Sequence, residues 1–241
     1  MRTQKTDRSA ARLILQLVIA FWASLSAGTL FATPAGYSEY LVPVAAQQAW
    51  DIFVDIDNDP TLDDTDGIHC VIAVAVGSDG TTIYYDHWED GLDFDPLSPS
   101  STADETFTGD KGDVVTFDNT VPIPRSSAVT RYDGRDRIYV AGGAVSVSLA
   151  YWPETIGTVF ALAWELYPTK QYQTTYTIPV GEDLVGTLGY NDFAQVFTVV
   201  QAAEDGTQIQ IDDPTGGGVE VTATLDKGEV TNLYHHAAYT T

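Results

Sequence analysis

Three short motifs occur twice in the chain, in the same order, and this repetition is what most constrains the fold. The matched pairs are YLVPV (40–44) with YTIPV (176–180), SDGTTIYYD (78–86) with EDGTQIQID (204–212), and DKGDVVTF (110–117) with DKGEVTNL (226–233). They lie 136, 126 and 116 residues apart, a steady decrease that longer loops in the first copy would produce. The sequence therefore predicts two copies of one structural unit.

The repeated motifs have the composition of strands and tight turns. In DGT and DKG the glycine can adopt positive φ, and alternating apolar residues follow or precede it. No long segment of helical period is present beyond the N-terminal region, apart from a modest candidate helix at Ala45–Phe53. The chain is predicted to be all-β, with strands at 37–44, 70–76, 81–86, 114–118, 137–141, 144–151, 159–167, 174–180, 195–201, 207–212, 219–225 and 230–234.

The predicted fold class is a pair of related antiparallel β-sandwich-like repeat units that follow a signal peptide. The expected boundaries are 33–155 for the first unit and 156–241 for the second. Propeller-like blades are the alternative, because repeats of this kind can also close radially. The second copy has no counterpart of residues 133–154, so the second unit is either smaller or truncated, and truncation is favoured because an unfinished sheet would leave strand edges exposed.

The first 32 residues have the pattern of a secretory signal peptide. Arg2, Lys5, Arg8 and Arg12 precede an apolar run, and small residues follow it, with cleavage most plausible after Ala32. The run is short and interrupted by polar residues, which argues against a retained membrane anchor. We therefore expect a secreted or cell-surface protein with no membrane insertion after cleavage.

The charge of the chain excludes one class of partner. After removal of residues 1–32, 7 Lys and Arg would face 33 Asp and Glu, a net charge of −26. Such a surface repels nucleic acid and attracts cations. Cys70 is the only cysteine and lies in the apolar run HCVIAVAV, so an internal disulfide is impossible and an inert core thiol is expected.

The loop after the first DGT strand is the most unusual segment. The first copy continues with HWEDGLDFD at 87–95, whereas the second runs directly from Asp212 into DPTGGG. Paired acids can hydrolyse glycosides when one has a raised pKa, but the sequence shows no such pair, and an architectural hairpin end with a turn at Asp90-Gly91 is favoured. Cation or ligand binding remains open for Asp86, His87, Trp88, Glu89 and Asp90.

A second acidic loop, DIDNDPTLDDTD at 55–66, has the spacing of a calcium loop. Its candidate ligands are Asp55, Asp57, Asp59, Asp63 and Asp66, at loop positions 1, 3, 5, 9 and 12. Against calcium, Pro60 occupies the position that needs a glycine of positive φ, and a proline cannot adopt it. The alternative is a solvated acidic insertion, and Ca²⁺ is the only cofactor that the sequence suggests.

Arginines and tryptophans supply further candidates. The segment RYDGRDR at 131–137 holds three of the seven basic residues expected in the mature chain, and these arginines are predicted either to pair with acids of the 87–95 loop or simply to balance surface charge. His235 and His236 lie beside a strand end and have no matching ligand partner at a suitable spacing. Signatures of a catalytic nucleophile or of a phosphate loop are absent from the sequence.

Several segments together resemble the long N-terminal region of large secreted bacterial surface proteins, a region that is similar in turn to the N-terminal domain of IgGFc-binding proteins. The segments are IYYDHWEDG (83–91), NTVPIPR (119–125), YDGRDRIY (132–139), VSVSLAYWPE (145–154), ELYPT (165–169), YTIPVGED (176–183) and AAEDGTQIQID (202–212). The resemblance implies an extracellular, repeat-built adhesive or structural β module. It carries over no catalytic residues.

Two functions follow as hypotheses. The first is a non-catalytic extracellular or cell-surface β module for adhesion or structural spacing, which bound calcium would stabilise and whose partner would be a surface protein or a glycan. The second is a carbohydrate-binding or glycoside-hydrolysing domain that uses Trp88, Trp152 and Trp164 as stacking platforms. The second requires the three indoles to share one open groove beside Asp86 and Glu89.

Overall fold

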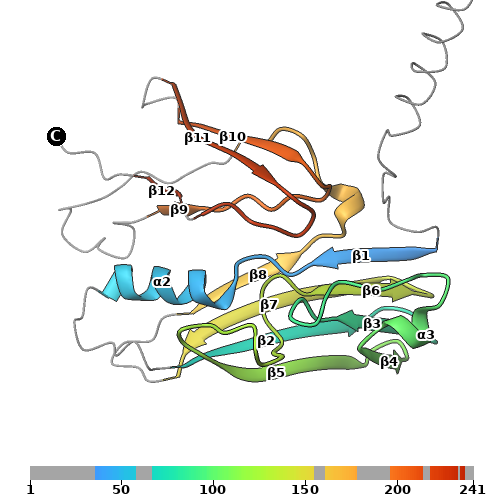
Figure 1. The fold of residues 1–241 in the computed structure, drawn as a ribbon. Helices are drawn as coiled ribbons and strands as arrows, with labels where there is room; N and C mark the ends of the chain where they lie inside the picture. Colours follow the sequence, from blue (N-terminus) through green and yellow to red (C-terminus); the bar gives the residue numbers. More distant parts are fainter. Residues whose placement is uncertain are drawn as a thin grey trace, which may run out of the picture. The chain divides into compact units, whose positions relative to one another are not determined.

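The computed structural model describes residues 36–57, 67–154, 161–177, 196–213, 218–232 and 234–236. All of them lie in one compact unit, Thr33–Thr241. This part of the chain contains two four-stranded antiparallel sheets and two separate pairs of strands, with few helices (Figure 1). The predicted all-β character is confirmed, and among the described residues there is neither a closed barrel nor a propeller.

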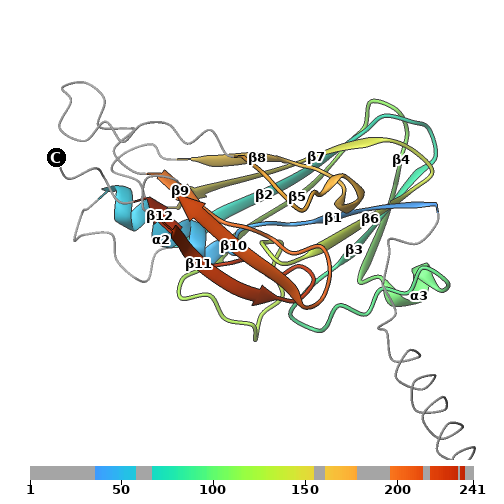
Figure 2. The ribbon, with the colours of Figure 1, turned by 90° about the horizontal axis from the view of Figure 1, so that it is seen from above.

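The first sheet has the strand order β1-β6-β3-β4, and the second has the order β5-β2-β7-β8. The first sheet comprises β1 (Tyr37–Leu41), β6 (Arg137–Ala141), β3 (Thr81–Asp86) and β4 (Glu105–Gly109). The second comprises β5 (Val114–Pro122), β2 (Gly67–Val76), β7 (Val145–Pro153) and β8 (Leu162–Leu166). Figure 2 shows the strands from above.

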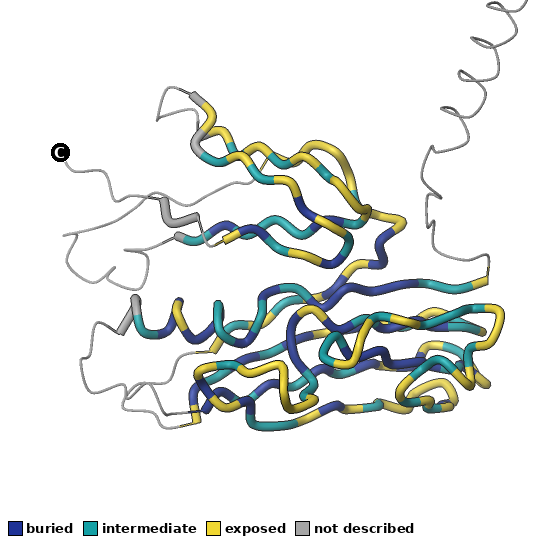
Figure 3. Tube along the Cα trace, viewed as in Figure 1, coloured by how far each residue is buried: buried dark blue, intermediate teal, exposed yellow. Residues whose placement is uncertain are grey.

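Both sheets contribute side chains to one hydrophobic core. Along β2 and β7 buried residues alternate with more exposed ones, the period of strands that cover a core on one face (Figure 3). The core joins Ile83 and Tyr85 of the first sheet to Ile72 and Leu149 of the second. Cys70 is buried in it, as expected for an inert thiol, and burial raises the pKa of that thiol well above its ordinary value.

The described residues contain few helices. The predicted helix at Ala45–Phe53 is present as α2 (Ala46–Asp57), and its residues Trp50 and Phe53 pack into the core. A four-residue helix, α3 (Pro99–Thr102), and a 3-10 turn, η1 (Thr169–Gln171), were not predicted. Within the described part of the chain, no helix is long and apolar enough to span a membrane.

Among the described residues, four further strands follow β8. They are β9 (Val196–Thr198), β10 (Thr207–Asp213), β11 (Gly218–Leu225) and β12 (Tyr234–His236). β10 pairs with β11 and β12 pairs with β9, both antiparallel. Polar contacts connect this region to the first sheet: the Lys227 ammonium lies 2.6 Å from the Glu39 carboxylate, and Arg137 donates to the Lys227 carbonyl at 2.9 Å.

The β10–β11 pair has the same strand register as the β3–β4 pair. Thr81 faces Gly109 and Ile83 faces Phe107. At the positions that match them by motif, Thr207 faces Leu225 and Ile209 faces Ala223. The pairing of Ala75 with Val114 on β2 and β5 likewise has its counterpart in the bridge between Gln201 and Val230. Beyond that bridge, β9 and β12 pair in a register that is displaced by one residue from the register of β2 and β5.

The turns that flank these hairpins are also held by matching hydrogen bonds. Asp110 Oδ1 accepts the Gly80 amide at 2.9 Å, and Asp226 Oδ1 accepts the Gly206 amide at 3.0 Å. Three more pairs of bonds correspond in the same way. The Lys111 amide donates to Asp79, as the Lys227 amide does to Asp205. The Thr81 hydroxyl donates to the Ser78 carbonyl, as the Thr207 hydroxyl does to that of Glu204, and the Gly112 amide donates to the Val76 carbonyl, as the Gly228 amide does to that of Ala202. Gly80 and Gly206 have φ of +69° and +67°, as the turn motif requires.

Some predicted strands differ from the structure. The strand predicted at 174–180 is wrong over Thr174–Thr177, which are not in a strand, and 178–180 lie outside the described residues. In the segment predicted at 230–234, Val230 forms only an isolated bridge. β4 was not predicted at all. β8 pairs with β7, so the predicted boundary between 155 and 156 passes between two paired strands. The division into two units stays a prediction.

Candidate functional site

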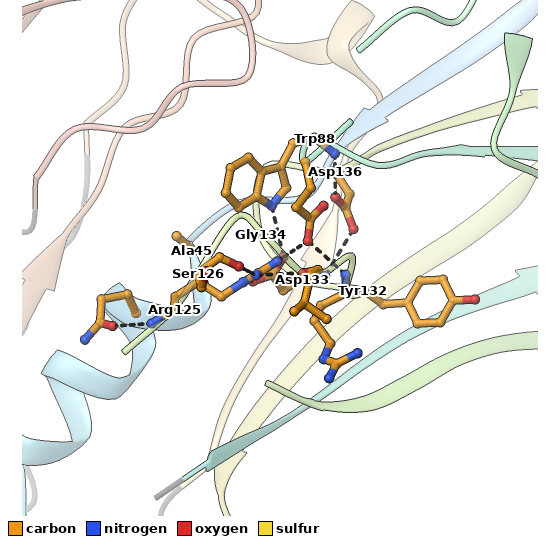
Figure 4. Close-up of polar contacts among 12 residues, drawn as sticks. Ala45, Trp88, Arg125, Ser126, Tyr132, Asp133, Gly134 and Asp136 are labelled. Carbon is orange, nitrogen blue, oxygen red and sulfur yellow. Dashed lines mark hydrogen bonds and ion pairs between the residues drawn. The ribbon is translucent and has the colours of Figure 1, made fainter. Parts of the chain in front are cut away.

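The candidate site lies where the loop after β3 meets the segment that connects β5 to β6. β3 ends at Asp86, so residues 87–95 leave the sheet beside Arg137, the first residue of β6 and the register partner of Asp86. The connecting segment supplies Arg125 and residues 131–136. Figure 4 shows the polar contacts that join these two loops.

Hydrogen bonds and cation–π contacts together fix the position of Trp88. The indole Nε1–H donates to Asp133 Oδ1 at 3.1 Å, and the Trp88 backbone amide donates to Asp136 Oδ1 at 3.2 Å (Figure 4). The guanidinium groups of Arg135 and Arg125 lie 4.1 and 5.1 Å from the ring centroid, within the range of cation–π attraction. Arg135 holds this position with a φ of +91°, a conformation rare for a residue with a side chain.

Arg125 is the cation at the centre of this region. Its Nε donates to Asp133 Oδ2 at 2.7 Å, and its Nη2 forms an ion pair with Glu89 Oε1. The Arg125 side chain is 7% exposed and that of Glu89 is 2% exposed, so both charges are removed from water. Burial alone would lower the pKa of Arg125, but Asp133 and Glu89 outweigh it and raise the pKa.

His87 is buried among acidic and carbonyl oxygens. Its Nδ1 lies 3.2 Å from the Arg131 carbonyl and 3.5 Å from Asp136 Oδ2, and its Nε2 lies 3.3 Å from Glu105 Oε1. Each ring nitrogen therefore faces an acceptor, an arrangement that suits the imidazolium with both nitrogens protonated. Burial would lower the pKa of His87, but Asp136, Glu105 and Glu89 outweigh it and raise the pKa to about 9.

Asp136 connects the loop to the core. Its Oδ2 accepts the Tyr85 hydroxyl at 2.6 Å and the Asp133 amide at 3.1 Å. The side chain is fully buried, and this burial raises the pKa of Asp136 although His87 and Tyr85 oppose the shift. Asp133 is buried as well, and burial raises its pKa despite the opposing effect of Arg125.

Asp86 is also fully buried, but its surroundings are poorer in donors. Neither of its carboxylate oxygens has a hydrogen bond of ordinary geometry. Burial, reinforced by the charge of Asp104, raises the pKa of Asp86 to about 7, although Arg137 opposes the shift. Asp104 itself accepts the His87 amide at 2.6 Å. Asp90, by contrast, is exposed, and the Gly91 that follows it has the positive φ expected of a turn.

One group of these side chains could hold a metal ion. A ligand atom of His87, of Glu89 and of Asp136 all lie within 4.8 Å of one another. Glu89 Oε2 is buried without a hydrogen bond partner, whereas Oε1 is engaged by Arg125 and by the Arg131 amide at 2.8 Å. A metal at this position would have to displace the proton that the surrounding acids favour on His87.

The other predicted metal site cannot be built from the described residues. Asp55 and Asp57 lie in the last turn of α2, and Asp59, Asp63 and Asp66 lie outside the described residues. The calcium loop therefore stays a prediction. His235 and His236 are placed in β12, where only their backbone is described.

The predicted pairing of Arg131, Arg135 and Arg137 with loop acids differs in detail from the structure. Arg131 contacts Glu89 through its backbone amide, and Arg135 stacks on Trp88. Arg137 lies opposite Asp86 and donates to the Lys227 carbonyl. The cation that pairs with the loop acid Glu89 is Arg125, which the sequence did not single out because it lies outside the RYDGRDR segment.

The three tryptophans do not form one platform. Trp164 faces Leu149 across the β7–β8 pair and packs against the core. Trp152 follows the buried Tyr151 on β7, so it projects from the opposite face of the sheet, where it stacks on His69 with 5.3 Å between ring centroids. Trp88 lies in the candidate site, where its ring contacts the guanidinium groups of Arg125 and Arg135.

Sequence reasoning missed several members of the network. Asp133, Asp136, Glu105 and Tyr132 come from segments distant from the loop, and Tyr132 donates to Glu105 Oε1 at 2.6 Å. Asp133 and Asp136 were visible only as acids within an arginine-rich run. The interruption of that run by acids is the one signal that could have indicated an internal ion-pair network.

Comparisons with protein-family models, with curated proteins and with solved structures found no match.

Proposed function

We propose that the chain is a non-catalytic extracellular or cell-surface β module that serves adhesion or structural spacing. The observation that carries the proposal is the state of the loop after β3. His87, Trp88 and Glu89 each contact other groups of the protein, and all three connect the end of β3 to the segment before β6. A loop held in this way braces the end of two sheets and leaves few of its polar groups for a ligand.

We further infer that the module is built from two related sets of strands. The matching register and the matching turn hydrogen bonds support this inference, because unrelated hairpins would share neither. The shared core of the two four-stranded sheets supports a sandwich-like arrangement for the first set. Repeated β units of this kind suit a spacer or an adhesive stalk. The resemblance to secreted bacterial surface proteins points to the same role.

The carbohydrate alternative is less well supported. Trp152 and Trp164 lie on opposite faces of one sheet, and Trp88 lies in the internal network of the candidate site. The three indoles therefore cannot bind one sugar chain together. Trp152 alone keeps a position on the outer face of its sheet. A sugar site there would have to rely on that single ring.

The proposal can be tested with the full chain displayed on cells that do not adhere on their own. We expect the displayed chain to increase adhesion to protein-coated or glycan-coated surfaces. The variant Trp88→Phe should lower adhesion and the melting temperature together, because it removes the bond to Asp133. Asp90→Asn, at an exposed position of the same loop, should change neither.

Two results would contradict the proposal. The first is a Trp88→Phe variant that melts like the parent but loses adhesion, which would make the loop a ligand site. The second is release of reducing sugar from polysaccharides by the parent chain, abolished in Asp86→Asn or Glu89→Gln. Loss of glycan binding in Trp152→Ala, with an unchanged melting temperature, would favour the carbohydrate alternative.

A further inference from the structure

We propose that His87, Glu89 and Asp136 form a binding site for a zinc ion, between the loop after β3 and the segment before β6. One ligand atom from each of these side chains lies within 4.8 Å of the other two. Such a site goes beyond the proposed function, because its ligand is an ion within the fold and not an outside partner. It does not depend on what the module adheres to.

The first observation is an oxygen atom without a partner. The Glu89 side chain is 2% exposed, and its Oε1 is engaged by Arg125 and by the Arg131 amide at 2.8 Å. Its Oε2 is buried as well, but it has no hydrogen bond. A buried carboxylate oxygen that has lost its water without gaining a partner is costly. A cation at this oxygen would supply the missing partner.

The second observation is an imbalance of charge. Four ion pairs in this region share only two cations, as His87 contacts Asp136 and Glu105, and Arg125 contacts Glu89 and Asp133. Even with a protonated imidazole, these contacts hold four negative charges against two positive charges. A Zn²⁺ ion that replaces one proton of the imidazole adds one positive charge. The excess of negative charge in a largely buried region favours this exchange.

The third observation is the spacing of the ligand atoms. Zinc bonds to imidazole nitrogen and to carboxylate oxygen are about 2.0–2.2 Å long, so two ligands of a tetrahedral ion lie about 3.3–3.6 Å apart. His87 Nδ1 lies 3.5 Å from Asp136 Oδ2 and 3.2 Å from the Arg131 carbonyl oxygen, which can supply a fourth ligand. The longest separation among the three side chains exceeds the tetrahedral spacing by no more than about 1.5 Å. Glu89 Oε2 can close such a gap without breaking a hydrogen bond.

The fourth observation is that further contacts orient the ligands. His87 Nε2 lies 3.3 Å from Glu105 Oε1, and Tyr132 donates to the same oxygen at 2.6 Å. A carboxylate at one ring nitrogen fixes the tautomer of a metal-bound histidine and leaves the other nitrogen for the ion. Asp136 Oδ2 is likewise held by the Tyr85 hydroxyl at 2.6 Å. The ligands are therefore positioned before any ion arrives.

The ligand set also selects the class of ion. Calcium and magnesium prefer oxygen ligands, whereas one imidazole with two carboxylates suits zinc and the neighbouring transition ions. The site is therefore distinct from the calcium loop predicted at 55–66. A buried ligand set with no position left for a substrate is typical of structural zinc. The bound ion would hold the loop after β3 to the segment before β6.

The test uses the full chain after treatment with chelator and dialysis. We expect isothermal titration calorimetry with Zn²⁺ to show a site that is lost in His87→Gln and weakened by about a hundredfold or more in Glu89→Gln, because each change removes a ligand. Glu105→Gln, which removes only an orienting contact, should weaken the same site by about tenfold. Two controls should bind like the parent: Asp90→Asn, an exposed acid of the same loop, and the double variant His235→Ala with His236→Ala.

A measurement on the parent chain locates the ion even where a variant fails to fold. The chain has four histidines, so NMR of the nitrogen-15-labelled imidazoles can follow each ring. Addition of Zn²⁺ should shift the Nδ1 resonance of His87 and leave a proton on its Nε2, which faces Glu105. The ring of His69, which stacks on Trp152, should not respond.

Three results would overturn the proposal. They are a parent chain that binds no Zn²⁺, a parent chain that binds Zn²⁺ without a change at the His87 ring, and a folded Glu89→Gln variant that binds Zn²⁺ as tightly as the parent. None of them bears on adhesion, because the ion pairs of the loop form in the absence of an ion. Failure of the zinc site and failure of the proposed function are therefore distinguishable.

Discussion

Arg125 shows at the level of one residue why the loop after β3 acts as a brace. Its guanidinium pairs with Asp133 and Glu89 and lies over the ring of Trp88. A planar fork of donors can serve two carboxylates at once, which an ammonium cannot do with the same geometry. The residue therefore contacts two neighbouring residues of the loop after β3, Trp88 and Glu89, and one residue of the segment before β6, Asp133.

Replacing this arginine should be costly. We expect Arg125→Leu to lower the free energy of unfolding by about 3–5 kcal/mol, because Glu89 and Asp133 would be left buried without a cation. Arg125→Lys should retain the charge but lose the fork, with a smaller loss of about 1–3 kcal/mol. Urea unfolding followed by tryptophan fluorescence measures both. A loss in Arg125→Leu no larger than for an exposed arginine would contradict the brace.

The pH dependence of stability should follow His87 and Asp86. The pKa of His87 in the folded chain is about 9, above the ordinary value of 6.5, so its contribution is complete below pH 6.5 and is lost as the pH rises through 9. The contribution of Asp86 to stability changes with pH in the same direction. Its pKa is raised from 3.8 to about 7, so its contribution is lost as the pH rises through 7. Both groups make the chain less stable in alkali.

Unfolding in urea at about pH 6 and at about pH 10 measures this dependence, and we expect a loss of about 1–3 kcal/mol at the higher pH. His87→Gln should flatten the part of the stability curve above neutral pH. Asp86→Asn should reduce the slope below neutral pH, where Asp136 contributes with the same sign. Equal stability at both pH values in the parent chain would show that the folded chain does not keep His87 protonated above its ordinary pKa.

At the scale of elements, the turn motifs predicted more of the structure than the strand composition did. β3 and β6 were predicted to the residue, because glycine and aspartate at their ends fix the turn geometry. Over 174–177, the described part of the strand predicted at 174–180, the chain is not in a strand, because a strand exists only where a partner pairs with it, and β1 owes its pairing to β6. Local propensity carries no information about such a distant partner.

The candidate site was predictable in part for the same reason. Trp88 and the Asp90-Gly91 turn were identified from the sequence as architectural, and the structure gives Trp88 internal partners. Asp133 and Asp136 were not identified, since their contacts with Trp88 depend on where the segment before β6 lies in the fold. Contacts between distant loops have no signature in the spacing of residues along one of them.

Matching hydrogen bonds in the two turns predict matching effects of mutation. Asp110→Ala removes the acceptor for the Gly80 amide, and Asp226→Ala removes the acceptor for the Gly206 amide. Each should accelerate amide exchange at its own glycine and cost about 1 kcal/mol of local stability. Asp95→Ala, whose carboxylate accepts the Leu97 amide in an exposed loop, provides a control outside the repeated turns. An effect in only one of the two turns would argue against their equivalence.

At the scale of the whole molecule, the acidic surface raises the question of calcium. A ligand that binds only the folded chain raises its stability by about 2.7 kcal/mol at a hundredfold excess over Kd. We expect calcium to raise the melting temperature relative to chelator, and Asp59→Asn with Asp63→Asn to abolish the rise. Glu89→Gln is the control, because it changes the second candidate metal site, His87, Glu89 and Asp136, and leaves the predicted calcium loop intact. An identical midpoint with calcium and with chelator would remove the metal from this account.

The account depends most on the second hairpin adopting the register of the first, and solution NMR of the full chain tests this directly. Cross-strand nuclear Overhauser contacts should join Gln208 to Thr224 and Ile209 to Ala223, as they join Thr82 to Thr108 and Ile83 to Phe107. That result would establish the same pairing in both strand sets. Contacts shifted by one residue in the second hairpin, which would place Ile209 and Ile211 on the other face, would contradict it.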